Sequence, residues 1–283
     1  MAGFIFSTAS LIHDVFTWLH PTPNIPSYGI PLPPIPHQVI HSQDIQEKHI
    51  LIIGDIHACF DEFKELIVEA KKKVNNEAIH IVCVGDMLNK GPKNFETVKF
   101  LQEMFSNGQL HAVRGNHEES ILREYMYKAQ NYDYSFPPKY HYLNDFSESD
   151  FAFLSNLPYS LRIPRINAVI VHAGLVPNVP LEKQKYGDIT RMRNLISTPT
   201  FLRFKVQAHP KTEKGVAWAT KWEGPEHVYF GHDAKRKIQD LPFATGLDSG
   251  CLYGNFLTGI IIDSSMHRSF VHVEAKQKYQ TTD

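Results

Sequence analysis

Potential metal ligands directly follow apolar runs at five places in this chain of 283 residues. They are aspartate, histidine and asparagine, which bind divalent cations through oxygen or nitrogen. No cysteine accompanies them as a ligand, so a thiolate-bound structural zinc is not expected. The five segments are Gly54-Asp55-Ile56-His57, Gly85-Asp86, Gly115-Asn116-His117-Glu118, Val171-His172-Ala173-Gly174 and Gly231-His232.

These residue types suit a pair of divalent ions. Two ions about 3.5 to 4 Å apart can hold both the attacking and the departing oxygen of an in-line phosphoryl displacement. Such a pair needs a carboxylate that touches both ions, and Asp86 is the natural bridge. We expect manganese, with zinc, iron, cobalt or magnesium as alternatives. A lone histidine is more often a packed or surface residue, so this prediction depends on five matches in one order.

The apolar runs predict strands that deliver their last residues to the carboxyl edge of a sheet, where open α/β sheets bind ligands. The first half of the chain alternates strand and helix, and Ser147 with Asp150 predicts a capping box at one helix start. The second half is rich in strands, which indicates two mixed sheets flanked by helices. We expect strands at residues 49–54, 79–84, 110–114, 159–163, 168–172, 216–220, 227–231, 256–262 and 269–274, and helices at 59–73, 94–106 and from about Glu118.

Over residues 49–263 these motifs resemble the calcineurin-like metallophosphoesterases, and within them the phosphoprotein-phosphatase branch. Other branches carry a second histidine two positions after the last one, where this chain has Ala234. The resemblance implies an α/β fold, a four-layer αββα sandwich, with a metal-bridging hydroxide as nucleophile. It also implies that His117 is a general acid beside the leaving group. The implied metal ligands are Asp55, His57 and Asp86 for one ion and Asp86, Asn116, His172 and His232 for the other.

The second motif departs from the protein phosphatases. Those enzymes have Gly-Asp-x-x-Asp-Arg-Gly, whereas this chain has Asn89 and Lys90 at the second Asp and the Arg. An asparagine cannot supply the negative charge that keeps His117 protonated at neutral pH. A serine alkoxide needs that proton in order to leave, but a phosphate leaves as a weakly basic anion. Both departures favour phosphoanhydride substrates, since a lysine is a point charge rather than a bidentate fork.

Two further stretches resemble the bacterial symmetrical diadenosine tetraphosphatase, and Lys90 resembles its eukaryotic relatives, the ApaH-like phosphatases. The stretches are residues 89–92 and residues 246–254 with Leu257-Thr258. They imply hydrolysis of dinucleoside polyphosphates, inorganic polyphosphate or messenger RNA caps. We expect Lys90 and Arg114 to neutralise charge in catalysis and Tyr253 to contact substrate. The alternatives are a protein Ser/Thr phosphatase and a non-catalytic scaffold, although no ligand position is missing.

Basic residues gather between the last two ligand motifs. Residues 181–221 hold nine Lys or Arg against three Asp or Glu, in a chain whose formal net charge is -1. We expect Arg191 and Arg193 to bind a polyanionic phosphate: a nucleotide, a polyphosphate or an RNA 5′ end. A solvated basic surface is the competing interpretation, and the overall charge gives no sign of duplex DNA as a partner. Aromatic neighbours that could stack a base are Tyr186, Phe201, Phe204, Trp218 and Trp222.

Composition divides the chain into an N-terminal extension, residues 1–48, and one catalytic domain, residues 49–283. Residues 3–19 are apolar but shorter than the roughly 20 apolar residues of a membrane-spanning helix. No Lys or Arg precedes Lys48, which argues against a secretory signal. Seven prolines between Pro21 and Pro36 predict an extended strap that a protein partner could bind. The unrelated spacings of Cys59, Cys83 and Cys251 indicate a reducing compartment, the cytoplasm.

Overall fold

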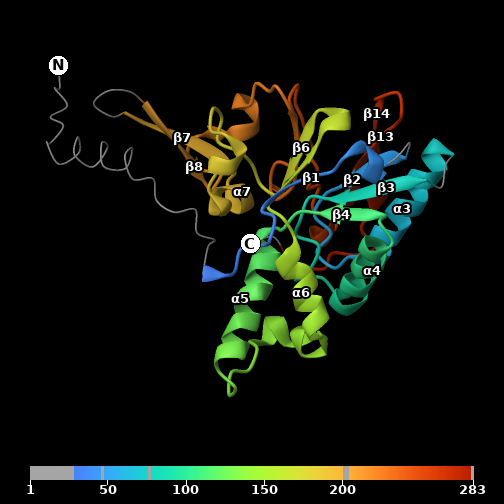
Figure 1. Ribbon diagram of the computed structural model, residues 1–283, viewed down its shortest axis with the longest axis vertical. Helices are drawn as coiled ribbons and strands as arrows, with labels where there is room; N and C mark the ends of the chain where they lie inside the picture. Colours follow the sequence, from blue (N-terminus) through green and yellow to red (C-terminus); the bar gives the residue numbers. More distant parts are fainter. Residues whose placement is uncertain (1–28, 46–47, 76–77, 200–203, 282–283) are drawn as a thin grey trace, which may run out of the picture.

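The computed structural model describes residues 29–45, 48–75, 78–199 and 204–281. Two β-sheets face each other, and helices cover the outer side of one of them (Figure 1). The apolar stretch at residues 3–19 and the first prolines of the expected strap lie outside the described residues. No helix in the described ranges is both long and apolar enough to cross a membrane.

The first sheet has the order β14-β13-β2-β3-β4. Strands β2, β3 and β4 are parallel, which brings their carboxyl ends to one edge. Strands β13 and β14 extend the sheet antiparallel to β2. Their bounds are β2 His49–Ile53, β3 Ile79–Cys83, β4 Leu110–Ala112, β13 Phe256–Ile262 and β14 Arg268–Glu274.

The second sheet has the order β1-β5-β6-β10-β12-β11. Strand β10 lies parallel between β6 and β12, so the ends of β6, β10 and β12 also meet at one edge. The strands are β1 His37–Val39, β5 Ser160–Ile163, β6 Ala168–Val171, β10 His227–Phe230, β11 Gln239–Asp240 and β12 Ala244–Gly246.

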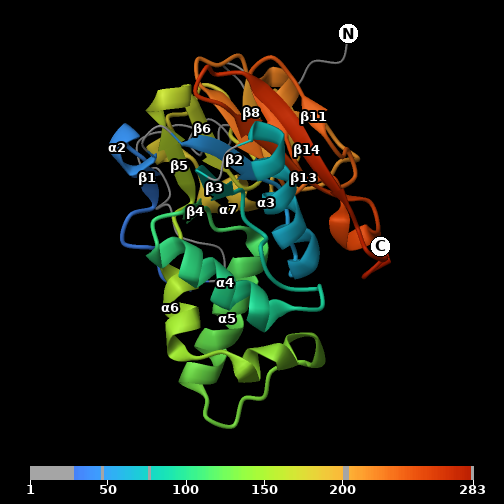
Figure 2. The same ribbon diagram turned by 90° about the vertical axis from the view of Figure 1, so that its right-hand side faces the viewer.

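The core between the sheets follows from side-chain alternation along the strands. In β2, Ile50 and Ile52 face the second sheet, while Leu51 and Ile53 face the helices. Figure 2 shows helices α4, α5 and α6 below the sheets, with α3 across the first sheet. These helices are α3 Phe60–Val74, α4 Asn94–Ser106, α5 Asn116–Gln130 and α6 Glu148–Asn156.

The outer layer on the second sheet is thin. Its apolar contacts come from Tyr186 and Ile189 of the short helix α7, Tyr186–Arg191, and from Trp218 in the 3₁₀ turn Trp218–Lys221. A small third sheet, of which only the strand at residues 216–220 was predicted, adds strands β7 Asn194–Pro199, β8 Phe204–His209 and β9 Val216–Ala217. The predicted sandwich of two mixed sheets is confirmed, with this mixed layer as its fourth.

Most predicted elements lie within two residues of the observed ones, and two differ in an informative way. The strand expected at residues 216–220 ends at Ala217, because Trp218 turns inward and its indole N–H donates to the Ala173 carbonyl at 2.9 Å. Helix α5 begins at Asn116 rather than near Glu118. A predicted metal ligand is therefore the first residue of a helix.

The chain before residue 49 contributes to the same packed unit. Strand β1 pairs in parallel with β5, and Ile40 donates its backbone N–H to the Arg162 carbonyl at 2.9 Å. The side chains of Ile40 and Ile45 are buried between the sheets, the latter in the short helix α2, Ser42–Ile45. We therefore infer that the domain starts before residue 37 and not at residue 49.

Ile40→Ala tests this placement. In the wild-type protein Ile40 is 0% exposed, whereas the neighbouring Val39 is 38% exposed. We expect Ile40→Ala to lower the free energy of unfolding by about 2–4 kcal/mol, since a buried aliphatic side chain is lost and a cavity remains. The matched control Val39→Ala should cost much less. Equal urea midpoints for the two variants would contradict the placement.

Candidate metal centre

The loops after strands of both sheets converge on one cavity of about 330 Å³. Its walls come from the segments after β2, β3, β10 and β12, from the first turn of α5, from the end of α7 and from the residue after β8. The lining residues are Asp55, His57, Asp86, Lys90, Asn116, His117, Arg191, Arg193, Pro210, His232, Ala234, Asp248 and Tyr253.

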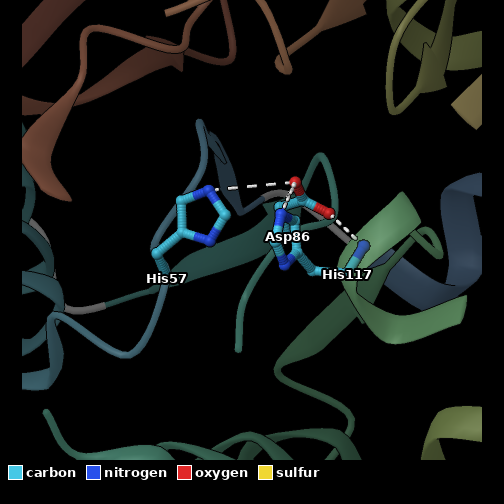
Figure 3. Close-up of side chains that lie close together, drawn as sticks. All are labelled: His57, Asp86 and His117. Carbon is cyan, nitrogen blue, oxygen red and sulfur yellow. Dashed lines mark hydrogen bonds and ion pairs between the residues drawn. The ribbon is translucent and has the colours of Figure 1, made fainter. Parts of the chain in front are cut away.

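Asp86 lies at the centre of the predicted ligands. Its Oδ2 atom is 3.8 Å from His57 Nε2 and 3.9 Å from His117 Nε2 (Figure 3). The same atom is 3.3 Å from His172 Nε2. Two groups that could each hold an ion share this carboxylate, one with His57 and His117 and the other with His172 and His232. This geometry suits the bridging role expected of Asp86.

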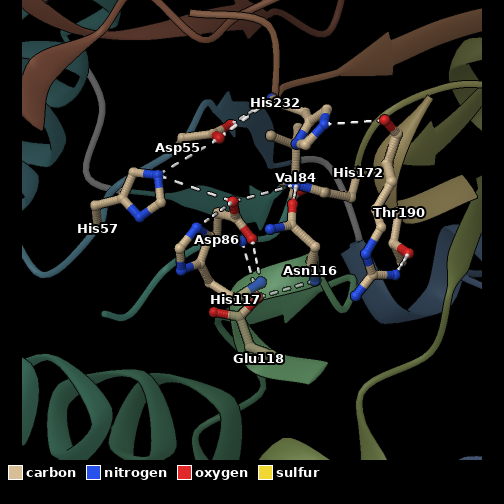
Figure 4. Close-up of polar contacts among 12 residues, drawn as sticks. Asp55, His57, Val84, Asp86, Asn116, His117, Glu118, His172, Thr190 and His232 are labelled. Atoms are coloured by element: carbon tan, nitrogen blue, oxygen red, sulfur yellow. Dashed lines mark hydrogen bonds and ion pairs between the residues drawn. The ribbon is translucent and has the colours of Figure 1, made fainter. Parts of the chain in front are cut away.

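The remaining predicted ligands border the same groups (Figure 4). The carboxylate of Asp55 lies 3.9 Å from His57 Nε2 and accepts the backbone N–H of His232 at 3.0 Å. The side-chain oxygen of Asn116 lies 3.0 Å from His172 Nε2. All six residues proposed as ligands therefore meet, although four come from loops of the first sheet or from α5 and two from loops of the second.

The loops reach this geometry through unusual backbone. His57, Asp86 and His232 have φ angles of 46°, 49° and 68°, in the left-handed region that non-glycine residues seldom occupy. Each such residue costs on the order of 1 kcal/mol, so the surrounding structure must hold it in place. A Cβ atom on Gly231 would lie 1.9 Å from Asp55 Oδ1, so close approach requires glycine here.

Glu118 ties the β3 loop to α5. Its two carboxylate oxygens accept the backbone N–H groups of Asp86 and Gly115 at 2.9 Å, Met87 at 2.9 Å and Leu88 at 3.2 Å. Asp86 in turn accepts the N–H of His117 at 2.9 Å through Oδ1. This oxygen is held by the helix, which leaves Oδ2 directed at the three histidines. The sequence prediction quoted Glu118 in its motif but gave it no role.

Backbone carbonyls orient the histidine rings. His172 Nδ1 lies 2.9 Å from the Val84 carbonyl, and His232 Nε2 lies 3.1 Å from the Arg191 carbonyl. A carbonyl accepts only from an N–H, so each ring turns its other nitrogen toward the cavity. Metal-binding histidines are usually oriented in this way.

The donor set fits a cation. With Nδ1 of His172 donating to a carbonyl, its Nε2 lone pair faces two further acceptors, the Asp86 carboxylate and the Asn116 oxygen. Burial lowers the pKa of His172, but the neighbouring Asp86 outweighs it, so the pKa is raised overall. Three acceptors that converge on one point need a positive charge between them, which a divalent ion supplies as well as a proton does.

Charge in the cavity supports the same fit. Burial, then Asp248 and Asp86, raise the pKa of Asp55 well above its usual value, and burial raises the pKa of Asp248 to about 6. Among the described residues, no lysine or arginine forms an ion pair with these three carboxyl groups. Divalent ions would neutralise this buried negative charge.

The predicted substrate residues divide in two. Lys90, Arg191, Arg193 and Tyr253 line the cavity, as expected for groups that meet a phosphate substrate. Arg114 does not, and its predicted role in charge neutralisation is wrong. Its side chain is 0% exposed and points behind the site.

The contacts of Arg114 explain its direction. Its guanidinium donates to the carbonyls of Ser155 at 2.5 Å and Pro31 at 3.3 Å and to the Tyr159 hydroxyl at 3.4 Å. Base stacking by Tyr186 or Trp218 is also wrong, because both rings are buried in the core of the second sheet. Trp222 is partly buried against that core, and the rings of Phe201 and Phe204 lie outside the described side chains.

Sequence reasoning missed Asp248 as a site residue. It follows β12, is 6% exposed and lines the cavity beside Asp55 and Asp86. Its position repeats the pattern of an acid after a buried strand. The strand is only Ala244–Gly246, however, too short to appear as an apolar run.

Comparison with known proteins agrees with this geometry. Residues 48–242 match the calcineurin-like phosphoesterase family, which is most of the chain. The chain therefore belongs to the calcineurin-like phosphoesterases, as the motifs predicted.

Two relatives and one solved structure are similar over most of their length. The chain is 23% identical to an asymmetrical bis(5′-nucleosyl)-tetraphosphatase, PrpE, of Oceanobacillus iheyensis, covering 81% of this chain and 93% of the relative. It is 22% identical to a zinc-dependent endopolyphosphatase of Saccharomyces cerevisiae, covering 79% of this chain and 78% of that relative. A crystal structure of a candidate diadenosine tetraphosphatase superposes with a TM-score of 0.71 at 30% identity, covering 85% of this chain and 98% of that one.

Glu118→Gln tests the support of the centre. The amide replaces one acceptor oxygen with a donor that faces backbone N–H groups, so the β3 loop should shift. We expect manganese affinity, measured by calorimetry, to fall about 10- to 100-fold, as when outer hydrogen bonds of a metal site are removed. Glu124→Gln, a buried acid farther along α5, is the matched control. Equal affinity in the two variants would show that Glu118 does not shape the centre.

Proposed function

We propose that this protein is a metal-dependent hydrolase of phosphoanhydride bonds, acting on dinucleoside polyphosphates or inorganic polyphosphate. The contact between Asn89 and His117 carries the proposal, because it sets what kind of leaving group the site assists. The residues proposed as ligands would hold two divalent ions, manganese first, which polarise a phosphoryl group and activate water at neutral pH.

Asn89 fixes the form of His117. Its side-chain oxygen accepts the backbone N–H of Lys90 at 2.9 Å, so its amide N–H is left to donate to His117 Nδ1 at 2.9 Å. Nδ1 is therefore the acceptor, and the ring proton stays on Nε2, the nitrogen that faces Asp86. Burial lowers the pKa of His117 to about 3, so the ring is neutral at pH 7.

A neutral imidazole donates a hydrogen bond more weakly than an imidazolium. It suits a leaving phosphate or nucleotide, which departs as a weakly basic oxyanion, better than a serine alkoxide, which must gain a proton. A carboxylate in place of Asn89 would favour the charged ring. The protein Ser/Thr phosphatase alternative is therefore not favoured.

The cations of the cavity match a substrate with several phosphates. Lys90, Arg191 and Arg193 line it together with the proposed metal ligands, and Tyr253 stands at the same wall. A single phosphate would bind at the metal ions, so these side chains are available to bind further phosphates of the same substrate. The names of the two relatives, a tetraphosphatase and an endopolyphosphatase, point to the same class of bond.

Messenger RNA caps contain the same type of bond and are further candidate substrates. The free buried thiols of Cys59, Cys83 and Cys251 support a reducing, cytoplasmic setting. A protein partner at the prolines between Pro21 and Pro36 stays a prediction.

A substrate panel tests the proposal. The enzyme is loaded with manganese, magnesium, cobalt or zinc and given diadenosine tetraphosphate, long-chain polyphosphate, capped RNA or a phosphoserine peptide. We expect kcat/KM for the best anhydride to exceed that for the peptide by at least about 100-fold, the usual contribution of a general acid. The reverse ranking would identify a protein phosphatase.

Asn89→Asp should narrow this preference. The carboxylate would accept from Nδ1–H and stabilise the imidazolium, so the ratio of peptide to anhydride turnover should rise about tenfold. Asn107→Asp adds the same charge at the exposed end of α4 and serves as control. If the ratio of peptide to anhydride turnover changes equally in Asn89→Asp and Asn107→Asp, then Asn89 does not have the role proposed for it.

A further inference from the structure

A buried polar network connects the cavity to residues 30–36, the last part of the N-terminal strap. Glu119 stands at its centre with a side chain that is 0% exposed. Consecutive helix residues are about 100° apart, so Glu118 faces the β3 loop while Glu119 faces α7. The metal centre does not use Glu119, and the sequence motifs did not single it out.

Both oxygens of Glu119 are occupied. Oε2 forms an ion pair with Nη1 of the cavity residue Arg191 and lies 3.3 Å from the Thr190 hydroxyl, whose single hydrogen is shared between Glu119 and the Tyr186 carbonyl at 3.0 Å. Oε1 accepts from the Tyr159 hydroxyl at 3.0 Å. Arg191 also donates to the Thr190 hydroxyl at 2.8 Å. The guanidinium is thus held from behind by a carboxylate that cannot itself move without breaking several contacts.

The far side of the network is equally fixed. The ring of Tyr159 stacks on Tyr186, the first residue of α7, with centroids 4.3 Å apart. Its hydroxyl receives a hydrogen bond from Arg114, which also binds the strap through the Pro31 carbonyl. Helix α7 is therefore anchored at its start by stacking and at its end by the ion pair of Arg191.

Two opposite effects of Glu119 on a phosphate substrate are possible in principle. The negative charge of Glu119 weakens the attraction of the cavity for anions. Its ion pair with Arg191 instead favours binding, because it restricts the Arg191 rotamers before the substrate binds. The side chain of Arg191 is partly exposed at the cavity, so solvent screens the charge effect more than the orientation effect.

We propose that Glu119 is a positioning residue that aims the Arg191 guanidinium at a second phosphate of the substrate, beyond the one at the metal ions. This rests on the proposed function, because only a substrate with several phosphates reaches both places. Arg114, behind Tyr159, supports the same arrangement rather than contacting substrate.

The test measures binding of tripolyphosphate as an inhibitor of para-nitrophenyl phosphate hydrolysis by the manganese-loaded enzyme. Glu119→Gln keeps the shape and one acceptor oxygen but loses the charge. We expect the inhibition constant to rise about tenfold, the order expected for one lost charge-assisted contact. Glu124→Gln on the same helix should leave it unchanged. An inhibition constant that falls or stays constant in Glu119→Gln would overturn the proposal, since only the charge effect would then operate.

A double-mutant cycle identifies the route. If Glu119 acts through Arg191, then Glu119→Gln should add nothing to Arg191→Gln. Multiplicative effects would overturn the proposal. Lys205→Ala removes an exposed cation of β8 that does not line the cavity and controls for general charge loss.

Two further variants keep the test usable if Glu119→Gln is unstable. If that variant has a much lower melting temperature, then Tyr159→Phe and Thr190→Val, which each remove one contact to Glu119, should still raise the inhibition constant for tripolyphosphate severalfold. No change in either would overturn the proposal. A wild-type enzyme that binds tripolyphosphate without cleaving any anhydride refutes only the proposed function. One that cleaves an anhydride without binding tripolyphosphate refutes only the role of Glu119.

Discussion

The structure depends on the burial of one carboxylate, Asp86, where the two sheets meet. One of its oxygens is held by the first turn of α5, and the other faces histidines from both sheets. Bringing these side chains to one carboxylate requires tight turns, which explains the left-handed backbone at His57, Asp86 and His232. The unfavourable backbone energy is offset by the packed sandwich core, whose strands pair in fixed register and hold the loops in place.

Charges of both signs surround this carboxylate. The buried acids Asp55 and Asp248 line the same cavity as Lys90, Arg191 and Arg193. Such a mixture of charges suits a ligand that carries both cations and anions, as a metal-bound chain of phosphates would. Burial lowers the pKa of His117, so in the proposed mechanism this ring would assist departure without adding a full charge.

The sequence was enough to predict most strands, and which residues at their ends meet in one cavity, because these signals are local. A strand, a glycine and a ligand follow one another within a few residues, and Gly231 shows why the glycine is needed. The direction of Arg114 could not be predicted, because it depends on partners in α6 and in the strap that are distant in sequence. Asp248 was missed since its strand is too short to show a pattern, and β7 was missed because its apolar and polar residues do not alternate.

The way the chain crosses between the sheets has a consequence for synthesis on the ribosome. Asp55 is separated by 177 residues from His232, whose N–H it accepts, and β1 meets its neighbour β5 across a contact of 123 residues. Such long-range contacts form late and slowly. A nascent chain that already contains the first three ligand motifs still lacks His232 and the strand that carries it. The emerging protein therefore passes most of its translation without all of the proposed ligands, and metal loading would follow the release of nearly the whole domain.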